Sequence, residues 1–394
     1  MWQDYENFTF GTFGDPKFTK DINLILYDLD NTVIMPDEKV RPGAPYNKWK
    51  FIKGAKERIQ KDASDALIIF VSNQLNLSDY IDKFKKKIED VMQQLSIPAL
   101  FYAASGQSSF RKPSTDIFTE HLLPLLKQKG VTTIKSIIYV GDAAGRKGDF
   151  GDTDRKFLYN IHLLLSSKIN PIKYDKVSKF KTPEEYFQNK QAESFKWDGI
   201  DPKKIMDDIL RGKKPSEIDT SLDEHFDDTQ EMILMIGPPA SGKSTIAKKI
   251  AEHGYIRINQ DELKSKAKVI KAIQDALKQG KSVVVDNTNL DPTKRAEIIK
   301  IAQKYFSETD KPVKIRAFHI NGDWDVRKQV EFAKHLNVVR QRLGGAYIKE
   351  IAYRVLLKNF EPPKEEEGFT EIINIPFIPR FKNAKHLLAF LQRS

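Results

Sequence analysis

The sequence contains no cysteine and no long apolar run. The first absence excludes disulfide bonds, cysteine-ligated metals and thiolate nucleophiles, so any chemistry must rely on carboxylates, histidines, hydroxyl groups or a bound metal. The second excludes a membrane-spanning helix, which needs about 20 consecutive apolar residues. Residues 1–20 are polar and include Asp4 and Glu6, so we also expect no secretory signal peptide. The sequence predicts a soluble, intracellular protein.

The charge balance is strongly basic. The chain has 394 residues, enough for two domains with separate cores. Its 65 lysines and arginines exceed its 54 aspartates and glutamates, which gives a net charge of +11. A basic surface gains affinity for nucleic acid by releasing the counterions of the phosphates. Basic metabolic enzymes also exist, so the charge favours a nucleic-acid partner without excluding a small-molecule substrate.

The first half of the chain alternates short apolar runs with segments in which apolar residues have helical spacing. This alternation predicts an α/β domain with a doubly wound parallel sheet, whose ligands gather at the carboxyl ends of the strands. Polar residues that can take part in catalysis or ligand binding follow each expected strand. The four expected strands are residues 24–27, 66–71, 99–103 and 137–140.

A second α/β alternation of the same kind begins near residue 232. We therefore predict two doubly wound parallel-sheet domains, at residues 1–227 and 228–394. Residues 169–229 are charged and poor in long apolar runs, so we expect helical pieces that finish the first domain and then a linker. The expected strands of the second domain are residues 232–236, 255–258, 282–285 and 313–318.

The first expected strand ends in two aspartates, Asp28 and Asp30, separated by one residue. In a sharp turn after a buried strand, both carboxylates can face the same magnesium ion. Asp28 would then attack phosphorus and form an aspartyl phosphate, while Asp30 would act first as an acid and then as a base. The competing interpretation is an acidic turn that caps the next element.

Later strand ends supply complementary residues. Lys112, between an expected strand and a helix that begins near Pro113, can balance the charge of a phosphate, and Asp142 after Gly141 can complete the metal site. Asp154 is a further candidate, although a helix N-cap explains this residue about as well. The phosphate-binding candidates of the first domain are Thr32, Ser72, Asn73 and Arg111.

The run Gly-Pro-Pro-Ala-Ser-Gly-Lys-Ser-Thr, which ends at Thr245, lies between an apolar strand and an expected helix. It matches the Walker A pattern, in which glycines let the backbone wrap phosphate groups at a helix N-terminus. The pattern predicts a bound nucleoside triphosphate such as ATP. Lys243 would contact the β- and γ-phosphates, and Ser244 would hold magnesium. The ATP-binding candidates are Gly237, Gly242, Lys243, Ser244 and Thr245.

Further candidates for phosphoryl transfer follow in the second domain. Asp261 can take the proton from an acceptor hydroxyl, and a helix cap is its alternative interpretation. Arg340 and Arg342 lie in a helical stretch and fit either a lid over the transferring phosphate or a solvated basic helix face. The loop after the third expected strand of this domain holds Asp286, Asn287 and Asn289.

The motifs of the first domain resemble those of the haloacid dehalogenase phosphatase superfamily. The resemblance implies that Asp28 is the nucleophile, Asp30 the acid–base residue, Asp142 a magnesium ligand and Lys112 a phosphate ligand. Asn31 stands where that family usually has glycine. We expect the exchange to be tolerated because asparagine also accepts positive φ.

Together, the two halves resemble eukaryotic polynucleotide kinase-phosphatases. The run Gly141-Asp142-Ala143-Ala144-Gly145-Arg146 is similar to their phosphatase half, and the Walker A loop with Asp261 is similar to their kinase half. The resemblance implies a nuclear DNA end-healing enzyme that removes 3′-phosphates and, with magnesium and ATP, phosphorylates 5′-hydroxyls. It also implies that Asp261 is the kinase base and Arg340 the lid arginine.

The resemblance also implies binding partners, and the sequence differs from animal members of the family in two respects. The implied partners are DNA ends, single-stranded, nicked or gapped, together with DNA ligase or other break-repair factors. Animal members carry an N-terminal forkhead-associated domain, for which this sequence has no room, so we expect no docking by that route. Gln260 stands where arginine is expected in animal members, and Lys264 is the residue that would have to compensate.

Three other interpretations stay open at the level of sequence. An RNA end-healing enzyme would use the same chemistry, since only the pocket for the sugar 2′ position separates the two. A small-molecule kinase fused to a phosphatase would bind its substrate with little salt dependence. A non-catalytic end sensor is disfavoured because Asp28 and Asp30 are both present, as are Lys243 and Asp261. For a strand substrate, the expected backbone contacts are Arg111, Arg146, Lys147 and Arg155.

Overall fold

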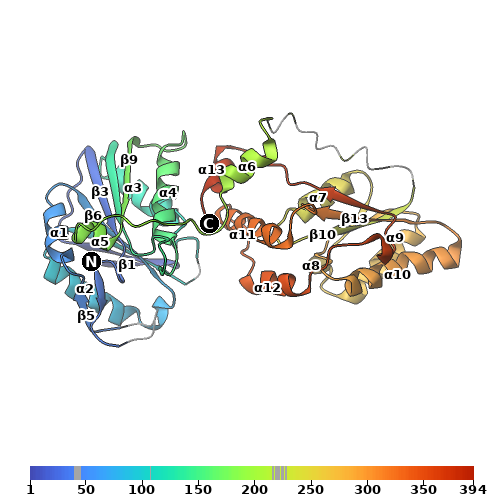
Figure 1. Ribbon diagram of the computed structural model, residues 1–394, viewed down its shortest axis with the longest axis horizontal. Helices are drawn as coiled ribbons and strands as arrows, with labels where there is room; N and C mark the ends of the chain where they lie inside the picture. Colours follow the sequence, from blue (N-terminus) through green and yellow to red (C-terminus); the bar gives the residue numbers. More distant parts are fainter. Residues whose placement is uncertain (40–45, 107, 215–216, 218–221, 223–225, 227–228) are drawn as a thin grey trace. The chain divides into compact units, whose positions relative to one another are not determined.

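The computed structural model describes residues 1–39, 46–106, 108–214, 217, 222, 226 and 229–394. Within these residues the chain forms two compact units (Figure 1). The first unit comprises Met1–Gly199 together with Asn383–Ser394, and the second comprises Ile200–Lys382. Each unit has its own central β-sheet and its own buried core, which confirms the predicted α/β class with two sheets.

The first unit has a seven-stranded sheet in the order β1-β2-β7-β6-β3-β8-β9. The strands from β7 to β9 in this order are parallel, whereas β2 pairs antiparallel with both β1 and β7. The predicted parallel sheet is therefore present and is extended at both edges. The strands are β1 (Trp2–Asp4), β2 (Phe8–Phe13), β3 (Asp21–Tyr27), β6 (Leu67–Gln74), β7 (Ala99–Ser105), β8 (Thr133–Val140) and β9 (Lys173–Lys181), with a separate antiparallel pair of β4 (Ile34–Pro36) and β5 (Trp49–Phe51).

Helices cover both faces of this sheet, which explains why its central strands are continuous apolar runs. In β3, Leu24 and Leu26 belong to one core cluster, and Ile25 and Tyr27 belong to another. Helices α3 and α4 contribute to the first cluster, and α1 and α2 contribute to the second. The helical segments are α1 (Ala55–Asp62), η1 (Leu77–Asp79), α2 (Ile81–Leu95), the π-helix η2 (Ile117–Leu122), α3 (Leu123–Gln128), α4 (Thr153–Leu165), α5 (Pro183–Phe187) and α13 (Ala384–Leu391).

Strand β9 corrects the expectation that residues 169–229 contain only helical pieces and a linker. Of the helical pieces expected to finish the first domain, α5 is present there, whereas α6 (Pro202–Leu210) belongs to the second unit; β9 precedes both and pairs in parallel with β8. As an edge strand, β9 leaves most of its side chains at least partly exposed, so its lysine-rich sequence lacks the apolar run of a buried strand. Its main-chain pairing leaves no signature in the residue types.

The second unit has a five-stranded, fully parallel sheet in the order β11-β12-β10-β13-β14. Four of these strands lie at the predicted positions, and the partly exposed edge strand β14 is an addition. The strands are β10 (Glu231–Ile236), β11 (Ile256–Ile258), β12 (Val283–Val285), β13 (Lys314–Ile320) and β14 (Glu371–Ile375). The helical segments are α6 (Pro202–Leu210), α7 (Lys243–Glu252), α8 (Gln260–Leu263), α9 (Lys266–Lys278), α10 (Pro292–Thr309), α11 (Val326–Arg342), α12 (Glu350–Asn359) and η5 (Glu365–Glu367).

The two units do not follow the predicted boundary at residue 227. Helix α13 belongs to the first unit, because Leu388 is buried in that unit's core. Conversely, Leu222 and Phe226 pack against the core of the second unit. The acidic segment expected in the linker, residues 223–228, lies outside the described residues except for Phe226. In the part of the chain that the structure describes, no helix combines the length and the apolar character needed to cross a membrane.

Candidate active sites

The carboxyl ends of the central strands of the first sheet bring the predicted phosphatase residues together. Asp28 directly follows β3, and its backbone N–H donates to the carbonyl oxygen of Val140 at the end of β8 (2.9 Å). Asp142 lies two residues beyond β8, and Ser72 lies near the end of β6. Because β3 lies between β6 and β8, these residues share one edge of the sheet, as the strand pattern predicts.

Lys112 lies at the centre of a buried ion cluster at this edge. Its Nζ atom donates to Asp28 Oδ1 (2.5 Å) and to the hydroxyl of Tyr139 (2.9 Å), and it pairs with Asp154 Oδ1 (2.7 Å). Burial lowers the pKa of Lys112, but the carboxylates of Asp154 and Asp28 outweigh burial and raise this pKa above its usual range. Lys112 therefore stays charged and holds both carboxylates in place.

Asp28, Asp142 and Asp154 form a carboxylate triad in which each residue offers an oxygen atom within 4.8 Å of the others. Burial raises the pKa of Asp28 well above its usual value; Lys112 opposes this shift, and Asp154 and Asp142 add to it. Burial, followed by the charge of Asp154, raises the pKa of Asp142 to about 7. Converging carboxylate oxygens are ligands that suit Mg²⁺, and a divalent cation would relieve their repulsion. The triad therefore fits the predicted magnesium site.

The position of Asp154 favours a role in the active site over a role as a helix N-cap. Asp152, not Asp154, occupies the N-cap position of α4, and Asp154 lies in the first turn with its carboxylate next to Lys112. Gly141 allows this approach, because a Cβ atom at residue 141 would overlap the carboxylate of Asp154. Asp154 therefore joins the triad, and the glycine before Asp142 is the sequence feature that makes room for it.

Asp30 has different partners from Asp28. Its carboxylate accepts hydrogen bonds from the hydroxyl of Tyr46 (2.6 Å) and from Gln74 Nε2 (2.6 Å), and Lys87 Nζ lies 4.0 Å away. Among the described residues, the carboxylate of Asp30 is not part of the triad, so the structure does not group it with the other predicted metal ligands. Sequence reasoning missed Tyr46 and Gln74, since neither residue type marks a catalytic pattern.

The turn after β3 has the backbone conformation that the sequence predicts. Asn31 has a φ of 57°, which confirms that asparagine at this position takes the positive φ usually left to glycine. Thr32 is completely buried in the same turn, and its hydroxyl donates to Asp142 Oδ1 at 3.5 Å. Thr32 thus lies within reach of the triad, as expected for a residue at the phosphate site.

The other predicted phosphate ligands have unequal environments. Asn73 forms two hydrogen bonds with the backbone of Lys112 (2.9 and 3.1 Å), so its side chain positions the lysine loop. Ser72 Oγ accepts a hydrogen bond from Gln74 Nε2 (2.8 Å). Arg111 Nη1 is buried and has no hydrogen-bond partner among the described residues. Arg111 is therefore the predicted ligand with an open donor.

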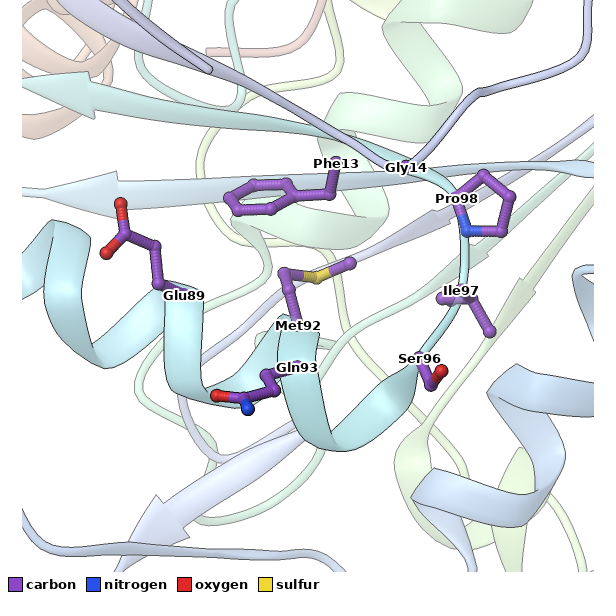
Figure 2. Close-up of a pocket in the computed structure, with 8 residues that line it drawn as sticks. All are labelled: Phe13, Gly14, Glu89, Met92, Gln93, Ser96, Ile97 and Pro98. Carbon is purple, nitrogen blue, oxygen red and sulfur yellow. The ribbon is translucent and has the colours of Figure 1, made fainter.

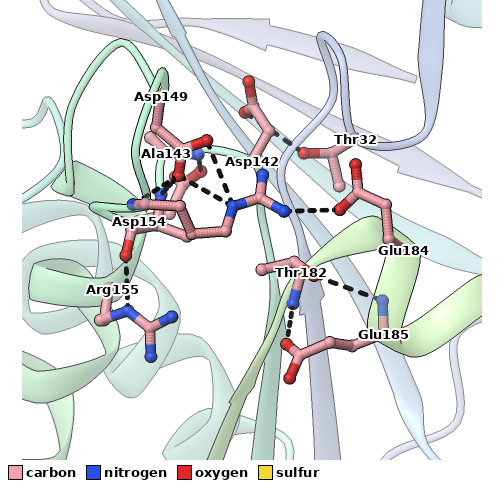
Figure 3. A network of polar contacts seen from close by, with 11 residues as sticks. Thr32, Asp142, Ala143, Asp149, Asp154, Arg155, Thr182, Glu184 and Glu185 are labelled. Carbon is pink, nitrogen blue, oxygen red and sulfur yellow. Dashed lines mark hydrogen bonds and ion pairs between the residues drawn. The ribbon is translucent and has the colours of Figure 1, made fainter. Parts of the chain in front are cut away.

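The loop between β8 and α4 is organised around Asp149 (Figure 3). Asp149 accepts hydrogen bonds from the backbone N–H groups of Ala144 (3.2 Å) and Arg146 (2.9 Å) and from Arg146 Nε (3.0 Å). Arg146 Nη1 also donates to Glu184 on α5 (2.8 Å), and Arg155 Nε donates to the carbonyl oxygen of Ala144 (2.7 Å). Arg146 and Arg155 were predicted to grip a strand, but in the structure Arg146 binds Asp149 and Glu184, and Arg155 binds the backbone of Ala144.

The tip of the same loop carries exposed residues. The aromatic side chain of Phe150 is fully exposed, and Lys147 is exposed close to it in sequence. An exposed aromatic ring is a stacking platform for a nucleobase, and a lysine can contact a phosphate. Lys147 is thus exposed at the loop tip, and Phe150 is an exposed aromatic residue there to which sequence reasoning assigned no role.

The Walker A loop connects β10 with α7 in the second unit. Gly237 and Gly242 have φ values of 143° and 100°, which other residues rarely adopt. Lys243 Nζ donates to two carbonyl oxygens of the loop (2.6 and 3.0 Å). Burial lowers the pKa of Lys243 to about 8, and Asp286 opposes this shift. Among the described residues, the buried hydroxyl of Ser241 makes no hydrogen bond, which fits a loop that wraps an anion.

Asp286, at the end of β12, ties the Walker A helix to the neighbouring strand. Its Oδ1 atom accepts a hydrogen bond from Ser244 (3.1 Å), and its Oδ2 atom accepts two from Arg257 on β11 (2.6 and 2.8 Å). Ser244 and Asp286 together supply oxygen atoms of the kind that hold the magnesium ion of a nucleotide. Sequence reasoning missed Arg257, because a single arginine within a strand carries no motif.

A short helix, α8, carries the proposed kinase base. The side chain of Asn259 caps this helix by accepting from the backbone N–H groups of Asp261 (2.9 Å) and Glu262 (3.2 Å). Asp261 is exposed and lies within α8, and Ser265 occupies the N-cap position of the lysine-rich helix α9, so Asp261 caps neither helix. Asn287 accepts a hydrogen bond from the backbone of Gln260 (3.0 Å) and links the second loop to α8.

The remaining predicted residues of the second unit, Asn289, Arg340 and Arg342, take no part in the hydrogen bonds described above. Asn289 Nδ2 donates to the carbonyl oxygen of Met235 (2.7 Å), so it fastens its loop to β10. Arg340 and Arg342 lie in the last turn of α11, where Arg340 is exposed and Arg342 is partly buried. Within the described ranges, the guanidinium of Arg340 forms no hydrogen bond or ion pair, which leaves it available to a phosphate group.

A pocket of about 540 Å³ lies at the end of the first sheet where β7 begins, away from the triad at the carboxyl ends of the strands (Figure 2). It forms where α2 ends and β7 begins, and Phe13, Met92, Ile97 and Pro98 give it a mainly apolar lining. Of its lining residues only Glu89 is charged. This pocket therefore lacks the groups that phosphate chemistry needs.

Both halves of the chain match known protein families. Residues 23–187 match the family described as polynucleotide kinase 3 phosphatase, and residues 232–335 match the family described as AAA domain. The first range contains the carboxylate triad with Lys112, and the second contains the Walker A loop with Asp286. The two candidate sites therefore fall within the two family matches.

Curated relatives match the same two halves. The bifunctional polynucleotide phosphatase/kinase of Schizosaccharomyces pombe is 32% identical, and the match covers 96% of this chain and 85% of the relative. A putative bifunctional polynucleotide phosphatase/kinase of Acanthamoeba polyphaga mimivirus is 30% identical, with 95% of this chain and 90% of the relative covered. A polynucleotide 3′-phosphatase of Saccharomyces mikatae is 28% identical over 44% of this chain and 89% of the relative. The relatives named for both activities thus span nearly the whole chain.

Proposed function

The chain belongs to the family of bifunctional polynucleotide phosphatases/kinases, and from this membership we propose that it heals DNA strand ends. Its activities are those of the family, polynucleotide 3′-phosphatase and polynucleotide 5′-kinase. In the proposed reaction, an end with a 3′-phosphate and a 5′-hydroxyl gains a 3′-hydroxyl and a 5′-phosphate, which a DNA ligase can seal. The observation that carries the proposal is that one chain holds both the buried triad with Lys112 and a Walker A loop tied to Asp286.

We assign removal of the 3′-phosphate to the first unit. Asp28 attacks phosphorus, the bond from phosphorus to the 3′ oxygen of the strand breaks, and the phosphoryl group is carried on Asp28. Asp30 donates a proton to the departing 3′ oxygen and then takes one from the water that hydrolyses the aspartyl phosphate. The hydrogen bonds from Tyr46 and Gln74 support this role, because they hold the carboxylate of Asp30 in one orientation, two residues after the nucleophile.

Charge compensation in the first unit comes from two sources. Lys112 keeps Asp28 in one orientation through its 2.5 Å hydrogen bond. Mg²⁺ bound by Asp28, Asp142 and Asp154 would neutralise the phosphate that Asp28 attacks. The open donor of Arg111 supports a further contact with a phosphoryl oxygen.

We assign phosphorylation of the 5′-hydroxyl to the second unit, with ATP as the donor. Lys243 would contact the β- and γ-phosphates, and Ser244, held by Asp286, would bind the magnesium ion that accompanies ATP. Asp261 takes the proton of the 5′-hydroxyl as the hydroxyl oxygen attacks the γ-phosphorus; the bond from the γ-phosphorus to the β,γ-bridging oxygen breaks, and ADP leaves. Arg340 places its guanidinium against the transferring phosphoryl group.

We also propose DNA as the polynucleotide, the nucleus as the location and action ahead of a DNA ligase. The net charge of +11 supports a polyanionic substrate, and the exposed pair Lys147 and Phe150 supports a strand that passes the first active site. The nuclear location and the ligase rest on the resemblance of the motifs to those of eukaryotic enzymes.

A single substrate tests these assignments. A gapped DNA duplex with a 3′-phosphate and a 5′-hydroxyl is incubated with Mg²⁺, with and without ATP. Asp28→Ala should lose only 3′-dephosphorylation and Lys243→Ala only ATP-dependent 5′-phosphorylation, so each variant is the control for the other. Faster turnover of matching RNA ends would show that RNA, not DNA, is the preferred substrate. Failure of the wild type on both polynucleotides would overturn the end-healing proposal.

A further inference from the structure

The C-terminal segment, residues 388–394, is built into the first unit, although it follows the second unit in sequence. Leu388 and Phe390 are buried. The guanidinium of Arg393 lies over the rings of Trp197 (4.4 Å) and Tyr159 (5.3 Å). The buried side chains of Leu388 and Phe390 and the stacked side chain of Arg393 therefore anchor this segment in the first unit, next to α4.

Asn160 on α4 joins the C-terminal segment to the loop that carries Lys112. Its side chain is completely buried, and its Nδ2 atom donates to the carbonyl oxygens of Pro113 (2.8 Å) and Arg393 (2.9 Å). Its Oδ1 atom accepts from the backbone N–H of Arg393 (2.8 Å). Both amide donors and one acceptor are thus engaged, so removal of the segment would leave a buried polar group unsatisfied. Pro113 directly follows Lys112.

Two further contacts connect the C-terminal segment with the same elements. Gln392 Nε2 donates to the hydroxyl of Thr115 (3.1 Å), on the loop after Lys112. Lys156 Nζ donates to the carbonyl oxygen of Ser394 (2.8 Å). Lys156 lies on α4 two residues after Asp154, which pairs with Lys112. The segment therefore contacts both the loop and the helix whose side chains meet at the triad.

We propose that the C-terminal segment is a positioning element of the 3′-phosphatase. It holds the loop of Lys112 against α4, so that Lys112 Nζ stays within hydrogen-bond distance of both Asp28 and Asp154. The proposal rests on the proposed roles of Asp28 and Lys112. Its consequence is that the phosphatase depends on residues that follow the kinase in the chain. Loss of the segment should reduce the first activity and spare the second.

The test compares Arg393→Pro with Arg393→Ala in the full chain. Proline removes the backbone N–H that donates to Asn160, and Gln392 already has the extended conformation that precedes proline (φ −68°, ψ 135°). Alanine also removes the side chain over Trp197 but keeps the N–H donor. The alanine variant therefore separates the backbone hydrogen bond from the stacking contact.

We expect Arg393→Pro to lower the phosphatase kcat about 10- to 100-fold, because displacement of a catalytic group by about 1 Å can cost about 100-fold. The KM for a small aryl phosphate and the kinase kcat should stay near their wild-type values. Arg393→Ala should keep most of the phosphatase kcat. Deletion of residues 392–394, which removes all the polar contacts of Gln392, Arg393 and Ser394, should lose at least as much as the proline variant.

All rates are measured well below the midpoint of thermal unfolding, and the folded fraction of each variant is recorded. Wild-type phosphatase kcat in both Arg393→Pro and the deletion would overturn the proposal. Equal losses in the proline and alanine variants would also overturn it, as would a loss explained entirely by unfolded protein. A wild-type chain without phosphatase activity would contradict the proposed function instead, so the two failures are distinguishable.

Discussion

The two active sites differ in how completely the fold encloses them. In the first unit, Asp28, Lys112 and Asp154 are 7%, 5% and 1% exposed. In the second unit, Lys243 and Asp286 are also buried, but Ser244, Asp261 and Arg340 are exposed. The first unit thus buries the charged groups around its proposed nucleophile, whereas the second unit buries Lys243 and Asp286 but leaves Asp261, the proposed base, and Arg340, the proposed lid residue, at the surface.

A physical reason accounts for this difference. A charge without a partner is costly in the interior, so the buried charges of the first unit are paired with each other through Lys112. An exposed carboxylate such as Asp261 is solvated and needs no partner. Exposure of the side on which the 5′-hydroxyl strand would bind also suits a substrate as large as a polynucleotide end.

The substitution Asp28→Asn should have the largest effect. An amide cannot replace the attacking carboxylate, so we expect the phosphatase kcat to fall on the order of 10⁴-fold or more, with the kinase kcat unchanged. Phosphate release from a 3′-phosphorylated oligonucleotide and 5′-phosphorylation of the same strand measure both activities in one sample. A phosphatase rate within about tenfold of wild type would show that Asp28 is not the nucleophile.

The pair Asp261→Asn and Asp286→Asn separates an exposed carboxylate from a buried one. We expect Asp261→Asn to lower the kinase kcat about 10²- to 10⁴-fold without changing stability, since the side chain is exposed. Asp286→Asn should also destabilise the second unit by about 1.5–3 kcal/mol, because Arg257 and Ser244 lose a charged partner. Kinase kinetics and denaturant unfolding measure the two effects. A stability loss for Asp261→Asn, or none for Asp286→Asn, would contradict the comparison.

Phe150→Ala tests the exposed tip of the first site. Base stacking on an aromatic side chain contributes about 1–3 kcal/mol, so kcat/KM for a 3′-phosphorylated oligonucleotide should fall about 5- to 150-fold. Turnover of a small aryl phosphate should not change, because that substrate has no base to stack. Phe150→Tyr is the matched control and should retain oligonucleotide turnover. Equal losses on both substrates would place Phe150 in the chemistry or the fold instead.

The last prediction concerns the effect of pH and magnesium on stability. The pKa of Asp142 is raised from 3.8 to about 7, so between these values the folded protein binds more protons than the unfolded chain. In EDTA, the free energy of unfolding of the first unit should therefore fall as the pH rises through this window. Mg²⁺ requires the deprotonated carboxylates, so its stabilising effect should grow over the same window.

Thermal unfolding with EDTA or with Mg²⁺ at about pH 5.5 and about pH 8 checks this sign. At a Mg²⁺ concentration about 100-fold above Kd, the stabilisation should reach about 2.7 kcal/mol. Asp142→Asn is the control and should lose most of the pH dependence of the magnesium effect. A magnesium effect of equal size at both pH values in the wild type would contradict the assignment of the triad as the metal site.

Sequence reasoning located the main chemical groups because they occupy strand ends. Asp28, Lys112 and Asp142 follow separate strands, and parallel strands place their carboxyl ends at one edge of a sheet. The Walker A motif is similarly local, since strand, loop and helix are contiguous. For the same reason β3, β6, β7 and β8 of the first sheet and β10 to β13 of the second were predictable, while the edge strands β9 and β14, with their partly exposed side chains, were not.

The sequence by itself therefore determined the two α/β sheets, the Walker A loop and the strand-end residues, because these depend on local patterns of apolar and polar residue types. Only the tertiary structure decided that Asp154 joins the triad, that Arg146 ties its own loop to α5, and that residues 388–394 pack beside the loop of Lys112. These contacts join residues far apart in the chain, often through backbone groups. Backbone groups are the same in every residue, so such contacts leave no pattern in the sequence.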